Sequence, residues 1–110
     1  MCVIVGELSR VRETIERELQ KAGFRLVKLL LFGSRARGES RSGSDWDFYV
    51  IVDRDVPFSE KRKVAAGIRQ HLVREGFCTD LFIQSERVVE ERRQNTGYLT
   101  YYVLKEGIEV

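Results

Sequence analysis

Residues 33–47 read Gly-Ser-Arg-Ala-Arg-Gly-Glu-Ser-Arg-Ser-Gly-Ser-Asp-Trp-Asp, and this stretch decides how the chain is expected to fold. It opens with a turn of small residues and closes with two carboxylates two positions apart. Apolar runs flank it at residues 29–32 and 48–52, and such runs bounded by turn residues are typical of buried strands. The pattern predicts two neighbouring strands joined by a polar loop that is rich in arginine and serine.

The two carboxylates, Asp45 and Asp47, are expected to share one face of the second strand. Side chains alternate along a strand, so the two Cα atoms would lie roughly 6.6 Å apart. Like charges repel, and a divalent cation gives a reason for placing them together. Magnesium prefers oxygen ligands, and acids of this kind can bridge two ions about 3.5–4 Å apart. The alternative is an ordinary solvated strand edge.

The arrangement of these residues resembles a known signature. Gly33-Ser34, ten further residues and then Asp45-x-Asp47 at the head of an apolar strand are similar to the motif of the DNA polymerase beta-type nucleotidyltransferase superfamily. The Gly-Ser-Arg-Ala-Arg-Gly beginning resembles the minimal nucleotidyltransferase (MNT) branch, which includes the antitoxins of HEPN/MNT toxin–antitoxin systems. That pattern has a third acid on a later strand, and Asp80 stands in the matching place. The resemblance extends from about residue 8 to residue 108.

The resemblance implies a set of site residues. Asp45, Asp47 and Asp80 would be the catalytic residues and the ligands of two Mg²⁺ ions, with Mn²⁺ as an alternative metal. Nucleotide binding would fall to the start of the motif, with ATP as the substrate: Gly33, Ser34, Arg35 and Arg37. A glycine lets backbone approach phosphates closely, and arginine forks match phosphate oxygens. For the arginines, Arg41 in the loop included, exposed surface charge is the competing interpretation.

The resemblance also implies a function. Relatives of this kind act as protein adenylyltransferase antitoxins, which transfer AMP from ATP to a tyrosine hydroxyl of a cognate HEPN-type toxin RNase. This modification (AMPylation) blocks RNA cleavage, and the two proteins form a hetero-oligomer. A domain of about this length has no lobe of its own for an acceptor, so the acceptor is expected to come from the partner. Two alternatives stay open: a catalytically weak or inactive antitoxin that neutralises its partner sterically, and a small-molecule (antibiotic-type) nucleotidyltransferase subunit.

The composition of the chain limits the kinds of protein that it can be. The 110 residues predict one minimal nucleotidyltransferase domain, 1–110. Nineteen basic and 17 acidic residues leave a net charge of +2, which gives no argument for direct nucleic-acid binding. No apolar run approaches the roughly 20 residues of a membrane helix. The two cysteines have no disulfide or metal spacing, so a cytoplasmic protein with reduced thiols is expected.

Apolar periodicity predicts a small α/β (α+β) domain of the polymerase beta-like nucleotidyltransferase fold. A helix begins near Leu8, with its apolar stripe at three- and four-residue steps through Ala22. Ser34 and Ser59 are expected to cap helices that run to Glu39 and Arg74. Strands are predicted at residues 24–32, 45–52, 77–83 and 108–110, and further helices at 86–94 and 98–105. Together they indicate a small mixed β-sheet with helices packed on one face.

Three other features receive structural interpretations. His71 falls inside a helical pattern beside Leu72, so a structural role is favoured over catalysis. Tyr98, Tyr101 and Tyr102 form an aromatic group for which core packing is the default and a partner contact the alternative. Cys78 would share the face of Asp80, but nothing in its surroundings indicates an activated thiol.

Overall fold

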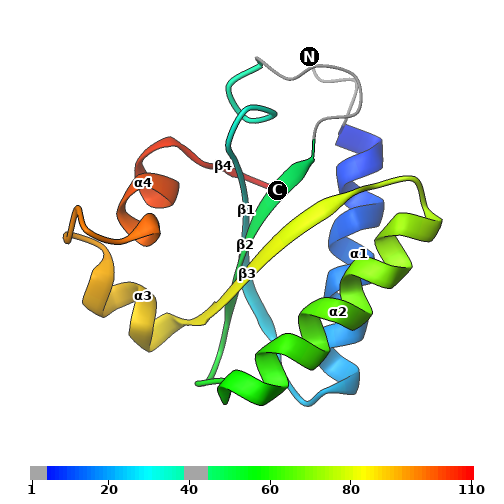
Figure 1. Ribbon diagram of the computed structural model, residues 1–110, viewed down its shortest axis with the longest axis horizontal. Helices are drawn as coiled ribbons and strands as arrows, with labels where there is room; N and C mark the ends of the chain where they lie inside the picture. Colours follow the sequence, from blue (N-terminus) through cyan, green and yellow to red (C-terminus); the bar gives the residue numbers. More distant parts are fainter. Residues whose placement is uncertain (1–4, 39–44) are drawn as a thin grey trace.

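In the computed structural model, which describes residues 5–38 and 45–110, a four-stranded sheet lies between two pairs of helices (Figure 1). In chain order the elements are α1 (Val5–Lys21), β1 (Leu26–Phe32), β2 (Trp46–Val52), α2 (Phe58–Arg74), β3 (Thr79–Ser85), α3 (Glu86–Arg92), α4 (Leu99–Glu106) and β4 (Ile108–Glu109). None of the helices in these two ranges has the length and apolar character needed to cross a lipid bilayer.

The sheet has the strand order β3-β2-β1-β4 and is mixed, as the sequence predicts. β1 pairs antiparallel with both β2 and β4, whereas β2 pairs in parallel with β3. The parallel pair requires a crossover between the two strands, and α2 supplies it. The result places the beginning of β2 beside the beginning of β3, at the end of the sheet where β1 finishes.

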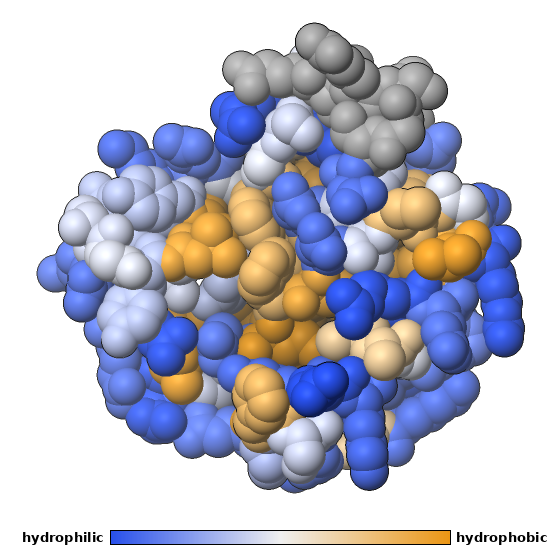
Figure 2. Space-filling view, viewed as in Figure 1, coloured by the Kyte–Doolittle hydropathy of each residue, from blue (hydrophilic) through white to orange (hydrophobic). Residues whose placement is uncertain are grey.

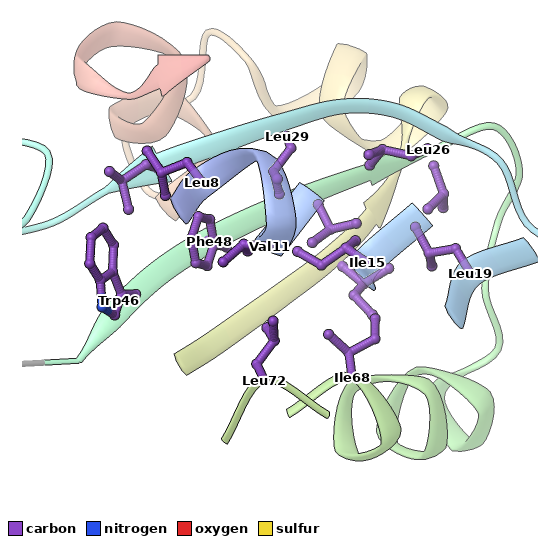
Figure 3. Packing of buried hydrophobic residues seen from close by; sticks show 14 of the residues in the cluster. Leu8, Val11, Ile15, Leu19, Leu26, Leu29, Trp46, Phe48, Ile68 and Leu72 are labelled. Carbon is purple, nitrogen blue, oxygen red and sulfur yellow. The ribbon is translucent and has the colours of Figure 1, made fainter. Parts of the chain in front are cut away.

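One face of the sheet packs on α1 and α2 and forms the larger core. The apolar stripe of α1 is buried here, and Leu8, Val11, Ile15 and Leu19 are at most 9% exposed. Figure 3 shows these side chains directed at Phe48 of β2 and at the buried side of α2. The predicted helical stripe is therefore confirmed as the core-facing side of α1.

The opposite face is covered as well, by α3 and α4. A second core cluster lies there: Leu30, Tyr49, Ile51, Val89 and Val103. The Tyr49 hydroxyl and the Thr100 hydroxyl of α4 are hydrogen-bonded at 2.5 Å in this buried layer. The expected mixed sheet and fold class are confirmed, but the prediction that helices pack on one face was wrong. β2 is buried on both faces of the sheet. Its apolar side chains alternate between the two faces, so each face needs a covering layer of helices.

Several predicted element ends also shift, each for a local reason. Residues 34–38 form turns instead of a Ser34-capped helix, and Glu39 lies outside the described residues, as does Arg41. Ser59 does not cap α2, because the carbonyl of Pro57 already accepts the Lys61 N–H at 2.9 Å. β3 begins at Thr79 because the preceding Phe77 N–H bonds to Leu72 O, closing the end of α2 at 2.8 Å.

Candidate active site

A tight turn follows β1 and brings backbone against the acids of β2. Gly33 has φ +80°, a conformation that side-chain-bearing residues rarely adopt. Its carbonyl accepts the N–H groups of Ala36 and Arg37 at 3.1 and 3.2 Å. A Cβ added at Gly33 would lie 2.3 Å from Oδ2 of Asp47. Glycine is therefore required twice here, by the backbone angle and by the closeness of the Asp47 carboxylate.

Asp47 lies between two strands that position it. In the antiparallel pair it stands opposite Phe32, the last residue of β1, and in the parallel pair its partner is Asp80 of β3. Paired residues point to the same face of a sheet, and neighbouring strands are about 4.8 Å apart. Asp47 and Asp80 are therefore side by side. Asp45 stands just before β2 and is exposed, as is Asp80, whereas Asp47 is half-buried.

The charges of the three acids act on one another. Burial raises the pKa of the Asp47 carboxyl above its ordinary value of 3.8, and the negative charges of Asp80 and Asp45 raise it further. The positive charge of Arg37 lowers the same pKa. The acids and Arg37 thus form one electrostatic group, in which the anionic form of Asp47 is disfavoured by burial and by like charge.

The donor chemistry of this group suits a hard divalent cation. Carboxylate oxygens are the ligands that Mg²⁺ prefers, and it commonly uses one or two of them together with substrate phosphates. Within residues 5–38 and 45–110, no three Asp, Glu, His or Cys side chains are arranged to hold a metal ion by themselves. The adjacent pair Asp47 and Asp80 fits the two-carboxylate mode, and Gly33 adds no side chain of its own against the Asp47 carboxylate.

The two arginines of the predicted nucleotide site lie in different surroundings. Arg37 is exposed, and its charge reaches Asp47. The guanidinium of Arg35 lies over the Trp46 ring, 4.2 Å from its centroid. Trp46 itself is buried and packs on Phe48 and Phe77, so it gives Arg35 a fixed support. Sequence reasoning missed this support, although an aromatic residue between the two acids was a signal for it.

An aromatic pair lies next to the acids: alternation in the third strand placed Phe82 on the face of Asp80, but its contact with Phe32 was not predicted. Phe32 of β1 and Phe82 of β3 have ring centroids 5.6 Å apart, although β2 separates their strands. Phe32 is the partner of Asp47, and Phe82 is two positions beyond Asp80, so both occupy the face of the acids. Phe82 is 41% exposed. Two aromatic rings therefore lie beside the charged side chains of the site. Alternation in residues 78–83 was the signal for the position of Phe82.

The chain matches a known protein family over most of its length. The family described as polymerase beta, nucleotidyltransferase matches residues 13–110, which include every predicted site residue. The chain belongs to this nucleotidyltransferase family. The nucleotidyltransferase domain expected from the Gly-Ser and Asp-x-Asp motif is thereby confirmed.

Two individual proteins resemble this nucleotidyltransferase domain. One is the protein adenylyltransferase MntA of Aphanizomenon flos-aquae (strain 2012/KM1/D3), 41% identical over 51 residues. That match spans 46% of this chain and 33% of the relative, so the chain is compared with only a third of that protein. The other is a crystal structure of a toxin–antitoxin with AMP-PNP. It superposes with a TM-score of 0.60 over 88% of this chain and 69% of that one, at 21% identity, and indicates a shared fold.

Proposed function

We propose that this nucleotidyltransferase domain transfers AMP from ATP to a tyrosine hydroxyl of a cognate toxin protein, an RNase of the HEPN type. Three observations support the proposal: the family, the adenylyltransferase name of the partial relative, and the toxin–antitoxin assembly of the structural neighbour. The observation that carries it is the pairing of Asp47 with Asp80 beside the Gly33 turn.

In this proposal the acids bind the metal and the turn binds the phosphates. Asp45, Asp47 and Asp80 would hold magnesium, which when bound neutralises charge on the phosphates and makes a nearby hydroxyl more acidic. The N–H groups of Gly33 and Ser34, at the start of the turn, would donate to phosphate oxygens. Arg37, near Asp47, and Arg35, supported by Trp46, would add positive charge to hold the triphosphate.

The transfer itself is a substitution at the α-phosphorus. The acceptor oxygen forms a bond to that phosphorus, the bond to the β-phosphate bridging oxygen breaks, and pyrophosphate leaves with its electron pair. The proton of the acceptor hydroxyl must be removed, and Asp80, an exposed carboxylate beside Asp47, would accept it. A tyrosine hydroxyl has an ordinary pKa of about 10, so it needs this assistance to react near neutral pH.

A second candidate function is a binding antitoxin that blocks its partner without modifying it. The toxin–antitoxin assembly of the structural neighbour supports this alternative as well as transfer. The retained Asp47–Asp80 pair and the glycine packed against it favour catalysis, because neither feature helps a merely covering surface.

Incubation with α-labelled ATP and magnesium, with and without the protein encoded beside this chain, separates the two functions. We expect label on the partner with the wild type, none with Asp80→Asn, and full labelling with the control Glu13→Gln on the exposed side of α1. Complete inhibition of the partner without any label would support the binding antitoxin and contradict transfer.

A further inference from the structure

The outer edge of β3 is open in the described part of the chain. β3 ends the strand order β3-β2-β1-β4 and pairs only with β2. An edge strand presents unpaired N–H and C=O groups, which form a template for another extended chain. An edge of this kind beside a groove can receive an additional strand whose charge suits the side chains around it.

A groove of about 400 Å³ runs along this edge, between β3 and α2. We call it the β3–α2 groove. Its apolar surface comes from Ala65 and Ala66 of α2 and from residues 81–83 of β3, which directly follow Asp80. Figure 2 shows hydrophobic side chains gathered in the middle of the face that carries β3 and α2, with hydrophilic side chains around them.

The border of the groove is positively charged. Lys61, Arg62 and Arg69 line it, and none of the described residues in its lining is an Asp or a Glu. Lys61 donates to Gln84 of β3 at 2.9 Å, whereas within residues 5–38 and 45–110 neither Arg62 nor Arg69 is paired with a carboxylate. α2 as a whole carries five Lys or Arg residues and one Glu.

The exposed side of α2 continues this surface. Two shallower hollows lie along it, and Ala66 borders them as well as the groove. Phe58 at one end is 75% exposed, and Val73 at the other is 57% exposed. The groove and the two hollows thus join into one surface along α2 that carries apolar and basic side chains together.

We propose that the β3–α2 groove binds an extended acidic segment of a partner protein, which joins the sheet as an additional strand beside β3. The backbone of that segment would pair with the open edge, its apolar side chains would contact the apolar lining of the groove, and carboxylates at the border would meet Arg62 and Arg69. This docking does not depend on the transfer reaction proposed above.

The β3–α2 groove suits a peptide better than a nucleic acid. The open N–H and C=O groups of β3 call for a backbone with matching groups, which a phosphodiester chain lacks. The groove floor is aliphatic apart from Phe82, whereas single-stranded nucleic acid is held by rows of aromatic platforms.

The test uses the full chain without nucleotide and a fluorescent twelve-residue peptide of alternating Glu and Val. We expect saturable binding that weakens as salt rises, and slower amide hydrogen exchange in β3. The double variant Arg62→Glu/Arg69→Glu should weaken binding by about tenfold or more, because it reverses both unpaired cations. Ala66→Glu should do the same with α2 intact, since Glu is a good helix former.

The matched control is Arg10→Glu/Arg17→Glu on the exposed side of α1, which changes net charge equally. It should leave affinity within about twofold, and a peptide of alternating Lys and Val should not bind. The proposal is overturned if the acidic peptide does not bind, if both double variants weaken it equally, or if β3 amides stay unprotected. Binding of an oligouridylate at the groove in place of the peptide would also overturn it.

Discussion

Asp47 of β2 and Asp80 of β3 are direct partners in a parallel pair, so two carboxylates stand side by side at one end of the sheet. Like charges opposite one another destabilise a sheet. The Gly33 turn packs against one of them, which leaves that carboxylate little room to turn away. The repulsion between the two carboxylates lowers the stability of the fold, and a bound cation with a triphosphate would relieve this repulsion.

Asp47→Asn should therefore raise the stability of the fold and lower the transfer activity. Burial and the neighbouring carboxylates raise the pKa of Asp47, so the neutral amide should increase the free energy of unfolding at pH 7. Transfer activity should fall by about a hundredfold or more, as expected for loss of a metal ligand. Chemical denaturation and labelled-ATP transfer measure the two effects.

Asp53→Asn is the matched comparison. Asp53 accepts the Arg25 N–H at 3.0 Å, and this bond lowers its pKa. The amide oxygen of Asn still accepts that N–H but without a negative charge, so the weaker bond should decrease the free energy of unfolding and leave transfer unchanged. If both variants lost stability equally, the repulsion assigned to Asp47 would be incorrect.

Gly33→Ala should be more harmful than an alanine at another left-handed glycine. At Gly33 the added Cβ meets Asp47 at 2.3 Å, whereas at Gly23, with φ +89°, nothing lies within 4 Å. Both variants should lose about 1 kcal/mol or more through backbone strain. Gly33→Ala should lose more and should also reduce ATP binding; equal losses from the two variants would contradict the close approach.

The stabilisation that Asp55 gives to the start of α3 should depend on pH. Asp55 accepts hydrogen bonds from Ser85 at 2.5 Å and from Arg87, and these bonds lower its pKa below 3.8. Their stabilisation is present above the unfolded pKa and is lost as the pH falls through the lower folded pKa. Asp55→Asn should lower the urea midpoint at pH 7, and the difference from wild type should vanish once the pH is below the folded pKa of Asp55. A difference that persisted there would contradict the charge-based explanation.

Magnesium and ATP should bind together more tightly than either does alone. The acids repel the triphosphate until a cation lies between them, and the phosphates complete the coordination of that cation. Calorimetry with magnesium or with a chelator measures the coupling. Equal ATP affinity in both conditions would place the nucleotide away from Asp47 and Asp80.

The sequence predicted part of this site because alternation is a local property. The spacing of Asp45 and Asp47 was enough to expect one shared face, and the later strand that carries Asp80 was visible as an apolar run. That β2 and β3 are parallel neighbours in register depends on packing of α2 across the sheet, which no local pattern contains. Here the family resemblance supplied the third acid.

Other features depended on distant contacts and stayed hidden. The second helical layer arises because Tyr49 and Ile51 are buried against residues of α3 and α4 more than 35 positions away. The position of Arg35 depends on Trp46, a buried ring whose support comes from Phe77 after α2. Such contacts are set by tertiary packing, so sequence spacing alone gave Arg35 and Arg37 the same interpretation.

The most direct test of the central claim is the intact mass of the partner protein after co-expression with this chain. The account predicts that the partner gains the mass of one or more AMP groups, that the gain maps to a tyrosine, and that it disappears with Asp80→Asn while the Glu13→Gln control keeps it. An unmodified partner that is fully inhibited by the wild-type chain would contradict nucleotidyl transfer at this site.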